Sequence, residues 1–465
     1  MSNLLAAVFK DQTTIDVFAQ DIFYGVAVAA LFLAAVAIAF VDAGGVRRKN
    51  LVDTWVQKLL AMLIAGGAMM LIGYGIWEWQ FNQAFGVPDP LGEALKGWWL
   101  GGDNYRALAQ NIDPKLVPGA DVLQIFGAFF FTWAAVFGAL IHSAGLERVK
   151  ASATYILAAV GGGIVMPFVA YLTWGSAGPL TNAGLHDFLG VYTLYILVGV
   201  WTLIMAWRAG PRRGSPVPHN LSWTAAGVGI FLFALPLAIV GCGYFIPGSG
   251  YFGISMADSS IGIVVTNVFV SYFAGALGGA ILAYRTRNVA MALLGPVAGY
   301  ISCASSFDVF HPWETFIVAF FGPLAVYLGI LFMRRIRVDE GKVVALTLFG
   351  GVYGVIVSGF VAWHTKVGGY FGITEGKYAF QNSEVTPWMQ LLGVVIVLAI
   401  AAITGLVLVF LIEKSIGLRV KAPQEDAGLD VAYWDLPTHD DPEFAELVKS
   451  RAVAPRPEGE PEPVI

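Results

Sequence analysis

Long runs of apolar residues recur along almost the whole chain, each about as long as a bilayer is thick. A transmembrane helix needs about 20 mostly apolar residues. The composition agrees with repeated spans, since 57% of the 465 residues are hydrophobic and only 13% are charged. We therefore predict an all-α polytopic membrane protein with eleven transmembrane helices. The predicted spans are 20–42, 53–79, 121–145, 151–174, 186–207, 222–245, 256–284, 289–305, 313–333, 342–363 and 387–412.

Basic residues mark alternate connections between these spans and so predict the orientation of the chain. Connections rich in Lys and Arg stay on the cytoplasmic side of a membrane. An odd number of spans places the two termini on opposite sides, so we expect a multi-pass protein of the plasma (inner) membrane with its N-terminus outside and its C-terminus in the cytoplasm. The basic connections are RRK (47–49), ERVK (147–150), RAGPRRG (208–214), YRTR (284–287), RRIR (334–337) and EKSIGLRVK (413–421).

Composition divides the chain into an extracytoplasmic N-terminus (1–19), a membrane domain (20–416) and an acidic cytoplasmic tail (417–465). The tail supplies most of the net charge of −5, so this charge indicates no nucleic-acid partner. The two cysteines, Cys242 and Cys303, make neither a disulfide framework nor a metal site. With no metal-ligand spacing, no phosphate-binding glycine loop and no nucleophile beside a base, we expect neither a cofactor nor an enzyme.

Two spans begin with the same pattern although they run in opposite directions. Asp187 precedes Tyr195 by eight residues, and Asp339 precedes Thr347 by eight. Matching segments of opposite direction are typical of the inverted repeats of transporters, which place the substrate path between the repeats near the midplane. An acid at a helix start also complements the helix dipole. The pattern leaves both interpretations open.

Several motifs together resemble the ammonium transporter/Rhesus family over nearly the whole chain. The resemblance implies two inverted five-helix repeats plus an outer eleventh helix, assembled as a homotrimer with one pore in each subunit. The chain lacks one feature of the family, the two histidines of the pore. The motifs are VDAGGVRRKN (41–50), TWGSAGPLTNAGLHDFLG (173–190), GPVAGYISCASSFDVFHPW (295–313) and GLRVKAPQEDAGLD (417–430).

The resemblance also assigns candidate site residues by position. It implies that Trp174, Asp187 and Ser249 form an outer substrate site. It also implies that Phe245 is one of two gating rings, and Trp133 stands where the second should be. Tyr195 and Thr347 stand where the family carries its two pore histidines, so they are expected to line the midpoint of the pore.

Tyrosine and threonine do not replace a histidine pair chemically. Imidazoles exchange protons near neutral pH, whereas tyrosine has a pKa near 10. Aromatic rings instead attract cations through their faces. The sequence therefore predicts a channel or transporter that moves ammonium or a related amine-type cation, including a methylated or larger one, without the histidine relay.

Other functions remain open at this stage. Tyr195 could plug the pore, in which case the protein would be a non-conducting amine sensor that signals to a cytoplasmic regulatory protein through its tail. A channel for uncharged gas would need an apolar path without a cation site. Aromatic residues make up 14% of the chain, so the rings could also serve packing alone.

Overall fold

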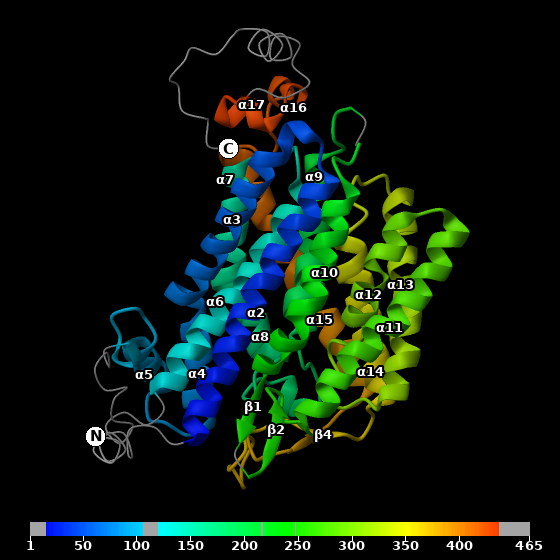
Figure 1. The fold of residues 1–465 in the computed structure, drawn as a ribbon. Helices are drawn as coiled ribbons and strands as arrows, with labels where there is room; N and C mark the ends of the chain where they lie inside the picture. The colour runs from blue at the N-terminus through cyan, green and yellow to red at the C-terminus, as the bar shows by residue number, and fades with distance from the viewer. Residues whose placement is uncertain (1–14, 106–119, 215–216, 247, 437–465) are drawn as a thin grey trace, which may run out of the picture.

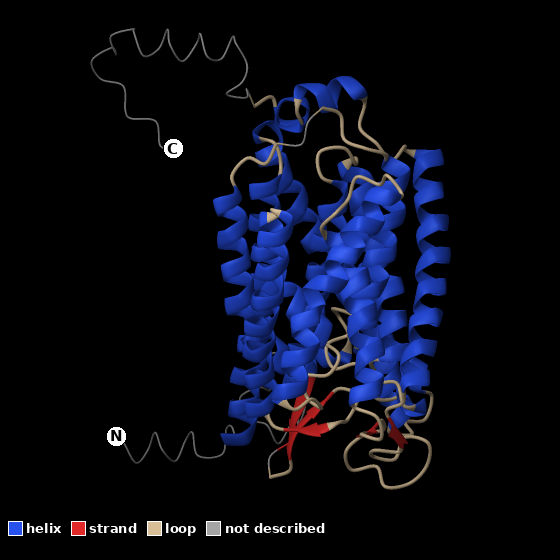
Figure 2. Cartoon of the chain, turned by 90° about the vertical axis from the view of Figure 1, so that its right-hand side faces the viewer, coloured by secondary structure: helices blue, strands red, loops and turns tan. Residues whose placement is uncertain are grey.

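The computed structural model describes residues 15–105, 120–214, 217–246 and 248–436. Its helices run roughly along a common axis (Figures 1 and 2). At one end of this axis lie the strands, and we call it the hairpin end. At the other end lie the last short helices, and we call it the tail end. The N-terminal extension 1–14 and the distal tail 437–465 lie outside the described residues.

Within the described residues, nine helices are long and apolar enough to cross a membrane, and two shorter apolar helices, 289–303 and 345–361, accompany them. Each falls within or overlaps one predicted span, which confirms the all-α membrane class. The helical segments are α2 (Ile15–Gly45), α3 (Leu51–Ala68), η2 (Met69–Gly73), α4 (Tyr74–Ala84), α6 (Ala120–Gly145), α7 (Ala151–Val160), η5 (Gly161–Val165), α8 (Met166–Thr173), η7 (Tyr192–Ile196), α9 (Leu197–Ala209), α10 (Leu221–Ala238), α11 (Ile261–Thr286), α12 (Val289–Cys303), α13 (Pro312–Arg335), η9 (Ala345–Phe349), α14 (Gly350–Val361) and α15 (Pro387–Ser415).

Short elements cap the two ends of the bundle. The strands pair antiparallel as β1–β2–β3 and as β4–β5, both at the hairpin end. The short elements are η1 (Arg48–Asn50), α5 (Pro90–Gly97), η3 (Asp103–Tyr105), η6 (Thr181–Ala183), η8 (Ile239–Cys242), α16 (Ala422–Ala427), α17 (Leu429–Trp434), β1 (Gly243–Ile246), β2 (Gly250–Gly253), β3 (Asp258–Ser259), β4 (Lys366–Val367) and β5 (Ser383–Glu384).

Several predicted span boundaries differ from the structure, among them the end of 222–245 and the start of 186–207. The helix expected over 222–245 ends by Cys242, and β1 follows. A glycine is required at this change of direction, because a Cβ at Gly243 would lie 2.4 Å from the hydroxyl of Tyr251 in the paired strand. The helix expected from residue 186 begins instead with η7 at Tyr192. Apolar strands and buried loops resemble spans in composition, which is why both ends were predicted too long.

Close helix contacts depend on small residues. Along α11 and α12, a Cβ at Gly275 would lie 2.5 Å from the carbonyl oxygen of Gly295, and a Cβ at Gly299 would lie 2.5 Å from that of Ser271. Such contacts let helix backbones approach closely, as in many membrane proteins. The two helices therefore pack as one unit beside α10.

The first part of the tail packs against the membrane domain. The carboxylate of Asp430 accepts hydrogen bonds from the backbone N–H of Val52 (3.1 Å) and of Asp53 (2.7 Å), in the first turn of α3. The indole N–H of Trp434 donates to Asp53 at 3.0 Å. Residues 417–436 are thus docked on the tail end, while the division at 416/417 stays a prediction.

Candidate functional site

A cavity of about 100 Å³ lies in the middle of the bundle, between helices of its two halves. Its walls come from α2, α6, α10, η8 and α12 and from the π-helical turns η7 and η9 with the residues just before them. Most of the lining side chains are apolar, among them Leu31, Val136, Leu235 and Ile301. The wall is therefore mostly apolar, so each polar group on it matters.

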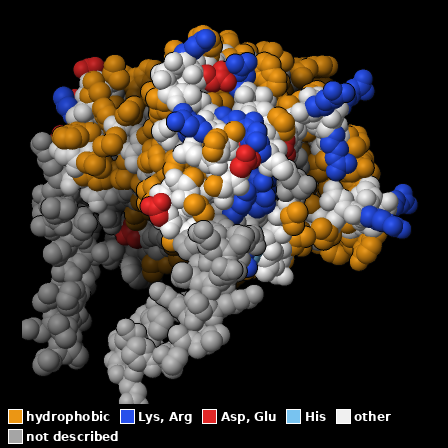
Figure 3. All heavy atoms as spheres, turned by 90° about the horizontal axis from the view of Figure 1, so that it is seen from above, with side chains coloured by type: hydrophobic (Ala, Val, Ile, Leu, Met, Phe, Trp, Pro, Cys, Tyr) orange, Lys and Arg blue, Asp and Glu red, His pale blue; other side chains and the backbone are white. Residues whose placement is uncertain are grey.

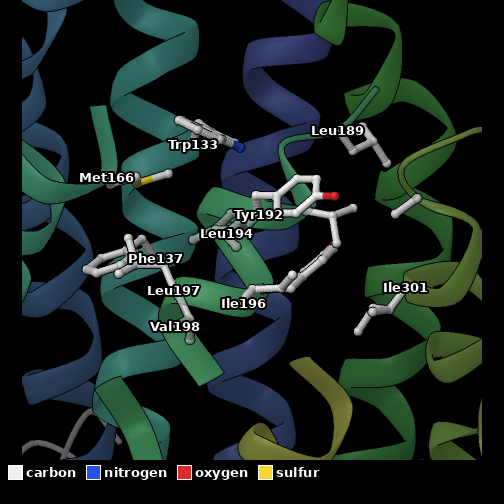
Figure 4. Close-up of a cluster of buried hydrophobic side chains, with 14 of the residues drawn as sticks. Trp133, Phe137, Met166, Leu189, Tyr192, Leu194, Ile196, Leu197, Val198 and Ile301 are labelled. Carbon is white, nitrogen blue, oxygen red and sulfur yellow. The ribbon is translucent and has the colours of Figure 1, made fainter. Parts of the chain in front are cut away.

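Three of the predicted site residues, Trp133, Tyr195 and Thr347, line this cavity. Trp133 is 1% exposed, and its indole N–H is buried without a hydrogen-bond partner among the described residues. Figure 4 shows its nitrogen pointing away from Met166. An unpaired N–H on a cavity wall costs free energy unless a ligand or water accepts its hydrogen bond.

Tyr195 and Thr347 lie on matching π-helical turns, η7 and η9, which face each other in the fold. The Thr347 hydroxyl donates to the carbonyl of Val343 at 2.7 Å, so its proton is used within its own helix. The Tyr195 hydroxyl has no hydrogen-bond partner in the part of the chain that the structure describes. Single π-helical turns are often found at functional sites, and here they set both side chains at the cavity.

Trp174 lies behind Trp133 rather than on the cavity wall. The two ring centroids are 4.5 Å apart, and the Trp174 indole N–H donates to the carbonyl of Phe188 at 3.0 Å. Phe130 and Trp77 extend this aromatic cluster, with ring centroids 4.6 Å apart. The cluster fills the space toward the hairpin end with rings.

Asp187 is fully buried, and its carboxylate binds backbone N–H groups. Its two carboxylate oxygens accept hydrogen bonds from the N–H groups of Val191 (2.8 Å) and Tyr192 (3.0 Å), at the start of η7. The side chain is not among the cavity-lining residues. In this structure the carboxylate caps the helix that presents Tyr195.

The counterpart of Asp187 near η9 is Glu340, one residue after the predicted Asp339. The Glu340 carboxylate accepts from the N–H groups of Val343 (2.7 Å) and Val344 (2.8 Å), just before η9. Burial raises the pKa of Glu340, and these N–H groups oppose the rise. Asp187 and Glu340 therefore cap η7 and η9 in the same way, and a glutamate takes the position that was predicted for Asp339.

Asp339 has a different role at the tail end. It forms ion pairs with Arg212 (2.8 Å) and Arg148 (3.7 Å). Although partial burial alone would raise its pKa, the hydrogen bonds and charge of Arg212, with the charge of Arg148, lower it to about 2. Asp339 therefore links the connections that carry Arg148 and Arg212, which lie far apart in the sequence.

Phe245 and Ser249 lie on the β1–β2 hairpin, away from the cavity wall. The Phe245 ring is half-buried, with its centroid 6.2 Å from that of Phe23. Ser249 is exposed in the turn between the strands. The structure thus brings three of the seven predicted residues to the cavity and distributes the other four, Trp174, Asp187, Phe245 and Ser249, around its hairpin end.

Known proteins resemble this chain over most of its length. A family model described as Ammonium Transporter Family matches residues 22–438. The chain belongs to the ammonium transporter family. Among curated relatives, it is 27% identical to the ammonium transporter Amt1 of Methanocaldococcus jannaschii over 446 residues, covering 91% of this chain and 96% of the relative.

Solved structures with the same fold include family members. A structure titled Sensor Amt Protein aligns with a TM-score of 0.71 at 19% identity, covering 89% of this chain and 98% of the other. The Mep2 structure of Candida albicans aligns with a TM-score of 0.68 at 16% identity, covering 89% and 88%. At this level of identity the likeness shows the fold alone.

Membership of the ammonium transporter family identifies this protein as a membrane channel or transporter rather than an enzyme, and it supports ammonium transport. Members of the family are generally trimers. The lining of the central cavity contains no histidine among the described residues.

A charged cluster that was not predicted from the sequence lies at the tail end of the cavity and is formed by Asp42, Lys58 and Lys342. Lys58 and Lys342 each pair with one oxygen of the Asp42 carboxylate. The available signal was Lys58 itself, a charge inside the predicted span 53–79, since intramembrane charges are costly and usually functional.

Proposed function

We propose that the protein moves ammonium or a small amine across the plasma membrane through the central cavity of each subunit of a homotrimer, without a histidine relay. The observation that carries this proposal is the position of Tyr195 and Thr347 on the cavity wall, each on a π-helical turn. Neither side chain exchanges protons near neutral pH as imidazole does. Transport through this cavity must therefore use another way of handling the proton.

The chemistry of the cavity suits an amine. A cavity of about 100 Å³ has room for ammonia or methylamine. Trp133 and Tyr195 offer ring faces, an N–H donor and a hydroxyl to such a molecule. Trp174, Asp187, Phe245 and Ser249 support the wall and the hairpin end around it.

The orientation follows from the distribution of basic residues. Figure 3 views the tail end, where Lys and Arg side chains gather. Basic residues concentrate on the cytoplasmic side of membrane proteins. The proposal therefore places the tail end in the cytoplasm and the hairpin end outside.

A second candidate is a non-conducting amine sensor. The aromatic cluster around Trp133 and Trp174 fills the hairpin side of the cavity, which favours a closed path. The docked tail segment 417–436 offers a surface that a cytoplasmic regulatory protein could bind. In this case amine would bind in the cavity without crossing the membrane.

Uptake of labelled methylamine into liposomes that contain the purified trimer separates these functions. Saturable uptake that Tyr195→Ala or Thr347→Val alters would support transport. Binding of methylamine without uptake would support the sensor instead. Absence of both uptake and binding, for ammonium and for methylamine, would overturn both proposals.

A further inference from the structure

His186 is buried at the hairpin end, between η6 and η7, and it is not among the residues that line the central cavity. Both nitrogens of its imidazole have a partner. Nε2 lies 2.9 Å from Oδ1 of Asp308, in the connection between α12 and α13. Nδ1 lies 2.9 Å from the hydroxyl of Ser255, in the connection between β2 and β3. One side chain therefore joins three connections that lie far apart in the sequence.

The chemistry of the three side chains sets the direction of these hydrogen bonds. An ionised carboxylate only accepts, so the Nε2–H of His186 donates to Asp308. In a neutral imidazole the other nitrogen is an acceptor, so the Ser255 hydroxyl donates to Nδ1. His186 and Ser255 are 0% exposed and Asp308 is 4% exposed, so bulk water does not compete for either hydrogen bond. Breaking one of them leaves a buried polar group unsatisfied, which is costly.

A serine, a histidine and an aspartate are also the catalytic groups of many hydrolases. In those enzymes the serine faces Nε2 of the histidine and the aspartate faces Nδ1, whereas here the two nitrogens are exchanged. Ser255 is also fully buried and does not line the central cavity. The geometry therefore favours a link between segments over nucleophilic catalysis. We call Ser255, His186 and Asp308 the histidine clamp.

The backbone of His186 is fixed to α15. Its N–H donates to the side-chain carbonyl of Gln390 at 3.2 Å, and its carbonyl accepts from the amide group of Gln390 at 2.8 Å. Gln390 lies in the first turn of α15, and its backbone carbonyl accepts from the hydroxyl of Tyr192, at the start of η7. The histidine therefore belongs to the rigid bundle, and its ring positions Ser255 relative to that bundle.

Ser255 belongs to the three-stranded sheet β1–β2–β3, which lies at the hairpin end (Figure 2). The sheet begins directly after Cys242, a residue of the cavity wall. On β1, the ring of Tyr244 packs with its centroid 5.7 Å from that of Phe126, on α6. Movement of the sheet away from α6 would therefore change the hairpin side of the cavity.

We propose that His186 is a positioning residue for transport, which holds the three-stranded sheet in place through Ser255 and so limits the size of the amine that enters from the hairpin end. This inference rests on the proposed transport function. A sheet held by the histidine clamp keeps its distance from α6, whereas a released sheet can move apart from α6 and admit a larger molecule. His186 acts through the sheet and does not touch the amine.

The test compares the uptake rates of methylamine and n-propylamine in liposomes that contain the full-length protein. In the unaltered protein we expect methylamine to enter much faster. His186→Phe keeps a ring but removes both hydrogen bonds of the clamp, and Ser255→Ala removes only the hydrogen bond to the sheet. In both variants we expect the ratio of methylamine to n-propylamine uptake to fall about tenfold, the factor that corresponds to one buried hydrogen bond. If His186→Phe does not fold, Ser255→Ala decides, because it leaves the contact of His186 with Asp308 in place.

Two further variants are controls. His186→Asn places an amide oxygen near the position of Nδ1, so Ser255 keeps an acceptor and the ratio should stay near that of the unaltered protein. His364→Phe removes an exposed histidine of the hairpin end, whose Nδ1 lies 3.0 Å from the carboxylate of Glu384, and should leave the ratio unchanged.

Three results would overturn this inference alone: an unchanged ratio in the folded clamp variants, an equal fall of the ratio in His364→Phe, or equal uptake of the two amines by the unaltered protein. Absence of any amine uptake in the unaltered protein would overturn the transport function, and this inference with it.

Discussion

The indole rings of Trp133 and Trp174 pack with their centroids 4.5 Å apart and their planes 33° apart. The two rings have the same chemistry but different hydrogen bonding. Trp174 donates its N–H to the carbonyl of Phe188 at 3.0 Å, whereas the N–H of Trp133 has no partner within the described ranges of the chain. One tryptophan therefore supports the wall of the cavity, and the other offers a donor to whatever enters it.

Replacing each tryptophan with phenylalanine should separate these roles. Trp174→Phe leaves the buried Phe188 carbonyl without its donor, so we expect a loss of about 1–3 kcal/mol in the free energy of unfolding. Trp133→Phe breaks no hydrogen bond but removes the donor, so we expect the half-saturating amine concentration to rise about fivefold, for about 1 kcal/mol. Thermal unfolding and methylamine uptake measure the two effects. Equal effects of both variants on uptake would contradict this assignment.

The carboxylates of Asp187 and Glu340 should act as a matched pair of helix caps. Asp187→Asn and Glu340→Gln each replace one acceptor oxygen with an N–H₂ group that faces backbone N–H groups. We expect each variant to lose about 1–3 kcal/mol of stability because a buried donor is left unsatisfied. Thermal unfolding of the purified protein measures the loss. If Asp187→Asn instead raises the half-saturating amine concentration and leaves stability unchanged, Asp187 contacts the substrate.

Features that depend on length and composition could be predicted from the sequence. Contacts between residues far apart in the chain could not. Apolar runs located the membrane helices, because a bilayer imposes a minimum length on each span. The pattern at Asp187 predicted the inverted relation of η7 and η9, but composition alone does not distinguish Glu340 from its neighbour Asp339. The contact of Lys342 with Asp42 joins residues 300 positions apart.

The sequence also gave a wrong prediction where a β-strand has the same apolar composition as a membrane span. The apolar hairpin after Cys242 reads as the end of a helix, and the structure instead places Phe245 on a strand and Ser249 in an exposed turn. Three of the predicted residues line the cavity because each lies on a helix, and packing in the bundle fixes which side of that helix faces inward: Trp133, Tyr195 and Thr347. Packing does not fix the positions of residues in the connections in this way.

Acid should weaken the contacts of Asp339 at the tail end. Its pKa is lowered from 3.8 to about 2 in the folded protein, so its ion pairs stabilise the fold above pH 4 and this contribution is lost as the pH falls from about 4 to about 2. Asp339→Asn should therefore lower the unfolding midpoint at neutral pH, and the gap from the unaltered protein should close over that window. Asp426→Asn is the control, because Asp426 pairs with Arg213 at the exposed surface and exposed pairs contribute little. A difference in unfolding midpoint that persists at pH 2 would show that the effect of Asp339→Asn does not come from the charge of the carboxylate.

The tail should be released by changing Asp430. Its carboxylate accepts hydrogen bonds from two backbone N–H groups in the first turn of α3. In an ordinary N-cap, a side chain at the start of the same helix accepts such hydrogen bonds. Loss of such a cap costs about 0.5–2 kcal/mol, so Asp430→Ala should increase the cleavage rate of the segment 417–436 by limited proteolysis about tenfold. Asp426→Ala removes an exposed acid from the same segment and should change the rate little. If both variants are cleaved at the same rate, general loss of negative charge, rather than the cap on α3, governs docking of the tail.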